Sequence, residues 1–413
     1  ILEKARRAGK LTALISDTRI THATPASFAA HVPRRSMENK IALQLAREGA
    51  HIMLSGGLRH WLPSGAGRPG SPLNEKYRRL LPRGLPLESV RKDDEEPLEI
   101  IKRRGYELVF DRKQLERASS GKILGLFSPS GMPDGIRVSA TRKDRNRTVP
   151  TLGEMTRKAL EALSSHDQGF FLMVEAGYID WAGHHSDAGR MIHEMMVLDE
   201  ALGVIMRWAA GRNDTLVILT ADHETGNFGF SYHGYAIPPA VSLRGDAFRG
   251  EKWEPGANYV DPAVLARIYG QKKSFEQILR EFDALPANER TAENFRRIFN
   301  EAVSFPISRK QAEEILATVP NPRYDPGKKK FRDRTVPLIR DFADFHLGGA
   351  ENRANLMGRA IASRQGVVWA TGTHTATPVL VIAWGPANTA ALFAGAYHST
   401  DLNRLMERAL GLR

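Results

Sequence analysis

Residues 170–185 read FFLMVEAGYIDWAGHH, an apolar run that passes directly into a stretch with acids and histidines. The apolar residues Phe170–Val174 predict a short buried strand. Asp180 and His184 are four residues apart, so one helical turn would place both on the same face. Aspartate oxygen and histidine nitrogen both bind zinc. A single pair at this spacing is common on protein surfaces, so the metal-site hypothesis needs further support from the sequence.

That support comes from two other predicted strands. Leu216–Thr220 has the pattern of a buried strand, and Asp222 and His223 follow just after it. His374 precedes the predicted strand Val379–Ala383. A charged pair beside an apolar strand costs desolvation energy unless it is solvated, hydrogen-bonded or metal-bound. Three clusters of acids and histidines at strand ends therefore favour one shared metal site.

Strand patterns and helix patterns alternate along much of the chain. This alternation predicts an α/β fold, a three-layer sandwich with a central, mostly parallel sheet between helices and with its site at the carboxyl edge. Because the alternation fails in the middle, we expect a core formed by residues 1–226 and 367–413 and an inserted cap, residues 227–366. The predicted strands are Leu11–Ile15, His51–Leu54, Leu108–Phe110, Ile123–Phe127, Phe170–Val174, Leu216–Leu219 and Val379–Ala383. The predicted helices are Met37–Glu48, Leu98–Arg104, Leu152–Ser164, Ala188–Ala210 and Thr400–Leu410, with Ser274–Phe282 and Arg309–Leu316 in the cap.

The composition limits the chemistry. The 413 residues include no cysteine, so any metal must be held by nitrogen and oxygen ligands. The net charge of +12 would suit a nucleic-acid binder or an enzyme that attracts anionic substrates. The basic runs Arg142–Arg147 and Lys328–Arg334 do not predict a cluster of basic residues on one face with interleaved aromatic residues, so we interpret them as surface loops and expect no nucleic-acid partner. No apolar stretch is long enough to predict a membrane span.

Five segments together resemble a known family. VEAGYIDWAGHH (174–185), TADHETGNF (220–228) and THTATPVLVIAWGP (373–386) resemble the metal-site motifs of the alkaline phosphatase family, in the family's order. ITHATPA (20–26) resembles another signature of that family, and LSGG (54–57) resembles its glycine-rich turn. The resemblance implies hydrolysis of phosphate monoesters, a homodimer, and a periplasmic or extracellular location.

The resemblance also implies three metal positions, two for Zn²⁺ and one for Mg²⁺. The implied ligands are Asp180, His184 and His374 for the first zinc, Asp222 and His223 for the second, and Glu175 and Thr24 for the third metal. His22 would lie just behind the third metal. A histidine there favours nitrogen ligation, so Zn²⁺ is the alternative to Mg²⁺ at this position. His185 is the alternative to His184.

Two further residues are implied at the substrate. Arg35 matches the arginine that clamps the phosphate, a role that suits its planar guanidinium, and the adjacent Arg34 is the alternative. Trp181 stands where relatives carry a charged residue near the phosphate, so it would either weaken phosphate binding or pack at the mouth of the site.

The nucleophile is the main departure from the family pattern. The resemblance implies a phosphoserine intermediate, and no Asp-Ser-Ala element occurs in these residues. We therefore expect that the serine belongs to a preceding segment, or that the protein has lost its nucleophile naturally. The alternatives are an inactive member that binds metal or phosphate, and a phosphodiesterase or phosphomutase of the same superfamily.

Overall fold

The structure, a computed structural model, describes residues 1–234, 236–328, 332–340 and 349–412. It comprises two compact units, which we describe separately. Unit 1 contains Ile1–Tyr178, Glu194–Asp222 and Leu380–Arg413, and unit 2 contains Ile179–His193 and His223–Val379. The division into a core and a cap at residues 226 and 366 stays a prediction.

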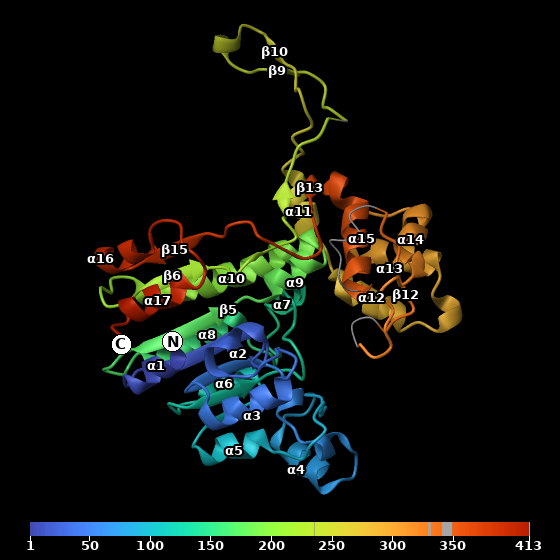
Figure 1. Ribbon diagram of the computed structural model, residues 1–413. Coiled ribbons are helices and arrows are strands. Elements are labelled where there is room, and N and C mark those ends of the chain that lie inside the picture. The colour runs from blue at the N-terminus through green and yellow to red at the C-terminus, as the bar shows by residue number, and fades with distance from the viewer. Residues whose placement is uncertain (235, 329–331, 341–348, 413) are drawn as a thin grey trace. The chain divides into compact units, whose positions relative to one another are not determined.

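Unit 1 is built on a five-stranded parallel sheet with the strand order β3-β4-β2-β1-β5. Its edge strand β5 is labelled in Figure 1. The strands are β1 (Leu11–Arg19), β2 (Ile52–Gly56), β3 (Glu107–Val109), β4 (Ile123–Leu126) and β5 (Phe170–Glu175). Parallel neighbours need crossover connections, and helices provide them here. The predicted α/β class with a central, mostly parallel sheet is confirmed.

On the central strands β1, β2 and β4 of this sheet, side chains of both faces are buried. Leu14, Met53 and Leu124 are paired across β1, β2 and β4 and belong to one apolar cluster with residues of α3 and α5. Alternation along the strand turns Ala13 and Ile15 to the opposite face, where they are also fully buried. Helix α8 contacts β1 as well. Helices therefore cover the sheet as the three-layer prediction requires.

The helices predicted at Met37–Glu48, Leu98–Arg104, Leu152–Ser164 and Thr400–Leu410 begin and end within one residue of these bounds, as α3, α5, α8 and α17. Helix α8 begins with a capping box, in which Thr151 and Glu154 each satisfy the other's backbone N–H. The bounds are α1 (Leu2–Arg7), α2 (Ala23–Ala29), α3 (Glu38–Glu48), α4 (Pro72–Leu80), α5 (Pro97–Arg103), α6 (Arg112–Arg117), α7 (Gly135–Thr141), α8 (Leu152–Leu163), α16 (Ala387–Ala390) and α17 (Asp401–Ala409). Helices α9 (Tyr178–His184) and α10 (Ala188–Ala209) contain residues of both units.

Two predicted strands pair outside the parallel sheet. Strands β6 (Val217–Thr220) and β15 (Val381–Trp384) form an antiparallel ribbon. The sequence predicts a buried strand at 216–219, but these residues are only half-buried, and Leu380 and Ile382 are 81% and 55% exposed. The reason is that each of the two strands has one neighbouring strand within the described part of the chain.

The glycine-rich turn follows β2. Gly57 has a φ of 98°, in the left-handed region that favours glycine. Its N–H donates to the carbonyl oxygen of Ser130 at 2.7 Å. A Cβ atom on Gly56 would lie 2.1 Å from that same oxygen, so both glycines are needed for this close approach.

Unit 2 has its own core, built from helices rather than a sheet. Phe275, Phe282, Phe295 and Phe299 are buried on the apolar faces of α12 and α13. The helices are α11 (Ala263–Tyr269), α12 (Phe275–Asp283), α13 (Ala292–Ala302), α14 (Arg309–Leu316) and α15 (Gly349–Gln365). Short antiparallel pairs complete the unit: β7 (Glu224–Thr225) with β14 (His374–Thr375), β8 (Gly229–Phe230) with β13 (Val367–Val368), β9 (Val241–Ser242) with β10 (Lys252–Trp253), and β11 (Thr318–Pro320) with β12 (Thr335–Pro337).

The β9–β10 ribbon lies in a stretch of unit 2 with exposed apolar side chains. Tyr232, Phe248, Trp253 and Tyr259 are each between 46% and 66% exposed. The Tyr259 ring lies 5.4 Å from that of Tyr232 and 6.2 Å from that of Trp253, measured between ring centres. We call residues 230–234 and 236–259 the aromatic arm.

Two surface predictions can be compared with the structure. In the run Arg142–Arg147 the residues are exposed except for a half-buried Arg147, whose guanidinium pairs with Glu154 at 2.9 Å. In the second basic run, residues 329–331 lie outside the described residues. Among the helices that the structure describes, each is too short or too polar to cross a membrane.

Candidate metal centre

Three predicted zinc ligands come together in unit 2. Asp180 and His184 lie one turn apart on α9, and His374 lies on β14. The Nε2 atom of His184 is 3.1 Å from that of His374. The Asp180 Oδ1 atom is 3.4 Å from the first of these nitrogens and 3.3 Å from the second. Residues 190 positions apart in the chain therefore present one ligand atom each to the same point.

The shape of this triangle fits zinc. Ligand atoms about 2.0–2.1 Å from a tetrahedral zinc ion are separated from one another by about 3.3–3.4 Å. The three observed separations lie within about 0.3 Å of that value. Among the described residues, this is the one group of three or more acids and histidines whose ligand atoms lie within 4.8 Å of one another.

A threonine that the sequence did not single out orients the carboxylate. Thr225 pairs with His374 across the β7–β14 ladder, and its hydroxyl donates to Asp180 Oδ1 at 2.6 Å. A Cβ atom on Gly183 would lie 2.7 Å from the Thr225 carbonyl oxygen, so the glycine lets α9 approach β7. An outer hydrogen bond of this kind fixes a ligand's orientation.

The backbone fixes the orientation of His184. Its Nδ1 atom lies 2.8 Å from the carbonyl oxygen of Gly372. Because a carbonyl oxygen only accepts hydrogen bonds, Nδ1 carries the proton, and the neutral ring has its lone pair on Nε2. That is the atom which faces Asp180 and His374.

The neighbouring histidines have different surroundings. The His223 ring stacks on the His374 ring with centres 3.5 Å apart, and its Nδ1 atom lies 3.2 Å from the Thr225 hydroxyl. His185 is not in the cluster, and burial lowers the pKa of its ring to about 4. Asp222, the other predicted ligand of the second zinc, belongs to unit 1.

A second polar cluster, in unit 1, surrounds Glu175 at the end of β5. The hydroxyl of Ser16 donates to the Glu175 carboxylate, and that of Thr18 donates to it at 3.3 Å. Thr24, the other predicted ligand of the third metal, also makes a side-chain hydrogen bond with Glu175. Oxygen atoms are the ligands that Mg²⁺ prefers.

Electrostatics at Glu175 favour a cation. Burial raises the pKa of the Glu175 carboxyl above its ordinary value, and the hydrogen bonds from Ser16, Thr24 and Thr18 oppose this shift. The negative charge of Asp222 raises the pKa further. A nearby metal ion would stabilise the ionised form of the Glu175 carboxyl.

The remaining predicted residues have specific neighbours. Arg35, which is exposed, has its Nη2 atom 2.9 Å from His22 Nε2, so the two residues predicted near the phosphate and the third metal are in contact. Arg34 is exposed as well. The guanidinium carbon of the buried Arg190 lies over the Trp181 ring, 6.0 Å from the ring centre. This contact supports a packing role for Trp181.

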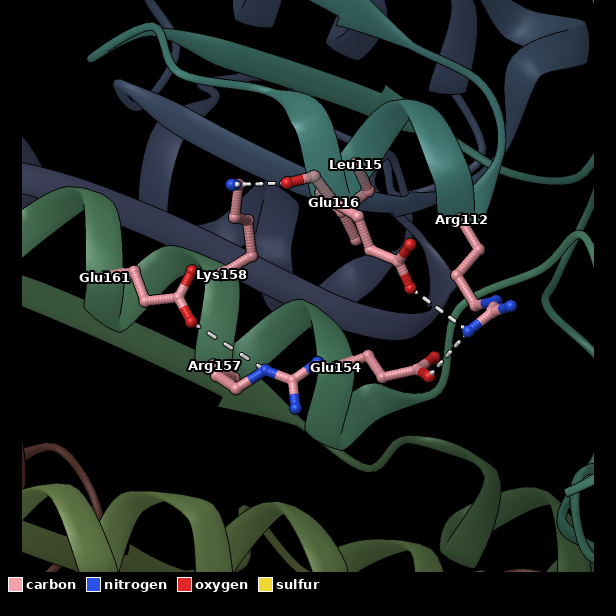
Figure 2. A pocket seen from close by; sticks show the side chains of 7 residues that line it. All are labelled: Arg112, Leu115, Glu116, Glu154, Arg157, Lys158 and Glu161. Atoms are coloured by element: carbon pink, nitrogen blue, oxygen red, sulfur yellow. Dashed lines mark hydrogen bonds and ion pairs between the residues drawn. The ribbon is translucent and has the colours of Figure 1, made fainter. Parts of the chain in front are cut away.

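Figure 2 shows a surface hollow of unit 1 between α6 and α8. Arg112 lies 3.1 Å from Glu116 and 3.8 Å from Glu154, and Arg157 lies 3.8 Å from Glu161. Arg112 and Arg157 are thus paired with carboxylates, and the Lys158 ammonium donates to the backbone carbonyl oxygen of Glu116 at 3.1 Å. Three glutamates face these three cations, so the hollow has no net charge that would select a charged substrate.

The family follows from comparison with known proteins. The family model described as "Alkaline phosphatase" matches residues 1–311. The chain is 32% identical over 296 residues to alkaline phosphatase 3 of Bacillus subtilis and 31% identical over 317 residues to alkaline phosphatase of Escherichia coli. These matches cover 69% and 67% of this chain and 58% and 59% of the two relatives.

A solved structure agrees. The crystal structure of Thermus thermophilus alkaline phosphatase superposes with a TM-score of 0.73 at 27% identity, covering 99% of this chain and 73% of that one. This chain belongs to the alkaline phosphatase family. It spans less than two thirds of the length of the two curated relatives named above.

Proposed function

We propose that the protein hydrolyses phosphate monoesters with the help of bound zinc. The observation that carries the proposal is the triangle formed by Asp180, His184 and His374, whose dimensions suit a tetrahedral zinc ion. Its residues come from two motifs that resemble those of the family, and they converge on one point. Family membership supports the same reaction class.

The proposed metal set is two Zn²⁺ and one Mg²⁺, with Zn²⁺ as the alternative third metal. His223 stacks against the first site and, with Asp222, would hold the second zinc. Glu175 and Thr24 would hold the third metal, for which the surrounding hydroxyl groups are suitable ligands. His22 would favour zinc there through its ring nitrogen.

Each protein group has a proposed task in the reaction. Bound zinc supplies a Lewis acid that stabilises negative charge on oxygen. The guanidinium of Arg35 binds the phosphate oxygens through paired N–H donors and orients the phosphorus atom for attack. Thr225 holds the Asp180 carboxylate, and Gly372 holds the His184 ring. The proposed route passes through a phosphoserine, whose serine belongs to a part of the protein outside these residues.

The test pairs zinc content with turnover of p-nitrophenyl phosphate. Both are measured on the 413-residue chain and on the product of the full-length gene. Zinc in both, with turnover only in the longer protein, is the expected result. Absence of zinc from the longer protein would overturn the proposed site.

The other outcomes identify the alternatives. Zinc in both proteins without turnover would favour an inactive member that binds metal or phosphate. Hydrolysis of a diester, bis(p-nitrophenyl) phosphate, in preference to the monoester would favour a phosphodiesterase. Transfer of phosphate between two positions of a sugar phosphate would favour a phosphomutase.

We further propose a homodimer in the periplasm or outside the cell. The aromatic arm supports the dimer, because exposed aromatic side chains in one stretch often mark an interaction surface. The molar mass from light scattering, measured with and without residues 240–254, tests the dimer. Fractionation of the cells in which the protein is naturally made tests the location.

A further inference from the structure

Asn355, on helix α15, contacts the backbone of a proposed zinc ligand. Its side chain is 1% exposed. The Nδ2 atom donates to the carbonyl oxygen of His184 and, at 3.0 Å, to that of Glu351 one turn earlier on α15. One amide group therefore ties the end of α9 to α15.

The same amide packs against the loop that leads to His374. A Cβ atom on Gly372 would lie 2.3 Å from Asn355 Oδ1 and 2.9 Å from Asn355 Nδ2. Gly372 is also the residue whose carbonyl oxygen accepts the His184 Nδ1 proton. Asn355 thus touches both chain segments that supply ligands, and these segments are 190 residues apart.

Helix α15 comes close enough for this because of a second glycine. A Cβ atom on Gly358 would lie 2.3 Å from the Ser186 carbonyl oxygen. Ser186 has a φ of 51° and ends the turn after α9. Asn355 and Gly358 are three residues apart, so they share one face of α15, and that face lies on residues 184–186.

We propose that Asn355 is a positioning residue for the proposed zinc site. It holds the His184 backbone and the 372–374 loop in the positions at which the Nε2 atoms of His184 and His374 can bind the same ion. The inference rests on the zinc site of the proposed function. Asparagine suits the task because an amide donates to two carbonyl oxygens without adding charge, whereas a carboxylate would repel them.

Asn300 provides a matched control in the same unit. Its amide also makes two backbone hydrogen bonds, accepting from Ile307 N–H at 2.7 Å and donating to Ile307 O at 3.1 Å. Neither partner belongs to the metal cluster. Loss of either amide should lower stability, but only loss of Asn355 should change metal binding.

The experiment compares Asn355→Ala and Asn300→Ala in the full-length protein. It measures zinc affinity by chelator competition, the absorption spectrum of the cobalt-substituted protein, and unfolding in urea. Asn355→Ala should bind zinc about 10- to 100-fold more weakly and alter the cobalt spectrum. Asn300→Ala should keep wild-type affinity and spectrum. Asn355→Asp, which is nearly the same shape, should also bind zinc more weakly and serves if the alanine variant does not fold.

Two results would overturn the inference. Wild-type zinc affinity in a folded Asn355 variant would show that the amide only stabilises the fold. An equal loss of affinity in Asn300→Ala would show that the effect comes through stability alone. Failure of the wild-type protein to bind zinc is a distinct result, because it rejects the proposed function and the positioning role together.

Discussion

The two polar clusters of this protein differ in their donor atoms. The cluster in unit 2 has two imidazole nitrogens and one carboxylate oxygen, and each separation between them is 3.1–3.4 Å. The cluster around Glu175 in unit 1 has only oxygen atoms, three of them hydroxyls. Nitrogen ligands suit zinc, whereas carboxylate and hydroxyl oxygens suit magnesium.

The clusters also differ in what holds them in place. His184 and Asp180 are each held from outside by a hydrogen bond: His184 Nδ1–H donates to the Gly372 carbonyl oxygen, and the Thr225 hydroxyl donates to Asp180. The Glu175 carboxylate is instead bonded directly to the hydroxyls beside it. A metal at the first cluster would occupy a point that the fold has already shaped. A metal at the second would replace hydrogen bonds with coordination.

The largest expected effect is loss of a zinc ligand. Asp180→Ala or His374→Ala in the full-length protein should reduce zinc affinity by more than the roughly 100-fold that loss of an outer partner costs, and turnover should collapse with it. Zinc content and p-nitrophenyl phosphate hydrolysis are the measurements. Unchanged zinc content would contradict the assignment of these residues as zinc ligands.

Glu175→Gln should distinguish the metals bound at the two clusters. Removing the negative charge should weaken magnesium binding by about 10-fold or more, while zinc stays bound. Metal content after dialysis against a graded series of magnesium concentrations measures both ions at once. If zinc falls and magnesium stays, the assignment of metals to the two clusters is reversed.

Arg35→Ala should change neither zinc binding nor magnesium binding. Hydrogen bonds to charged groups contribute about 1.5–3 kcal/mol, so inhibition by inorganic phosphate should weaken by roughly 10- to 100-fold. Arg34→Ala is the matched control. A stronger effect in the control would move the phosphate contact to Arg34, and loss of metal in Arg35→Ala would make Arg35 structural.

Thr225→Val tests the outer hydrogen bond of the zinc cluster. The two side chains have similar shapes, but valine cannot donate to Asp180. Zinc affinity should fall by about 10-fold, with no change in magnesium affinity. Chelator competition measures the zinc affinity. Wild-type affinity would mean that α9 alone orients the carboxylate.

Glu154→Gln should affect only the scaffold. Burial opposes ionisation, but hydrogen bonds from Arg147 and from the Thr151 N–H, together with the positive charges of Arg147 and Arg112, hold the pKa of Glu154 below its ordinary 4.5. The ionised form therefore contributes stability above that value, and the contribution is lost as the pH falls through the folded-state pKa. At pH 7 the variant should lose about 1 kcal/mol of unfolding free energy.

The measurement for this scaffold variant is urea unfolding of the wild type and Glu154→Gln at pH 7 and at progressively lower pH. The difference between the two proteins should shrink as the solution becomes more acidic. Both metal affinities should match the wild type. A difference that persists in acid would show that the Glu154 charge is not the cause.

Much of the fold follows from local sequence patterns. Helix α14 spans the predicted Arg309–Leu316, and β5 and α8 begin at the predicted residues because apolar periodicity and capping are local signals. The burial of β5 could not be read this way. Phe170–Val174 has the uninterrupted apolar pattern of a strand covered on both faces, yet its residues are half-buried, because β5 lies at the edge of the parallel sheet.

The site was only partly predictable for a similar reason. Asp180 and His184 are linked by helical spacing, which a sequence displays directly. Thr225 reaches Asp180 across 45 residues, and Asn355 reaches His184 across 171. No spacing rule connects such pairs. The position of Thr225 two residues after His223 is the one local signal that could have indicated its role.

The proton on His184 Nδ1 also sets the charge of the proposed centre. Because the Nδ1–H of His184 donates a hydrogen bond to the Gly372 carbonyl oxygen, His184 would bind a metal through Nε2 as a neutral ligand. If His374 is neutral too, Asp180 is the only negative charge among the three ligands. A divalent ion held there would keep one uncompensated positive charge, in a protein with a net charge of +12. Such a centre would attract phosphate dianions more strongly than a site with two carboxylates or thiolates would, and added salt should weaken that attraction.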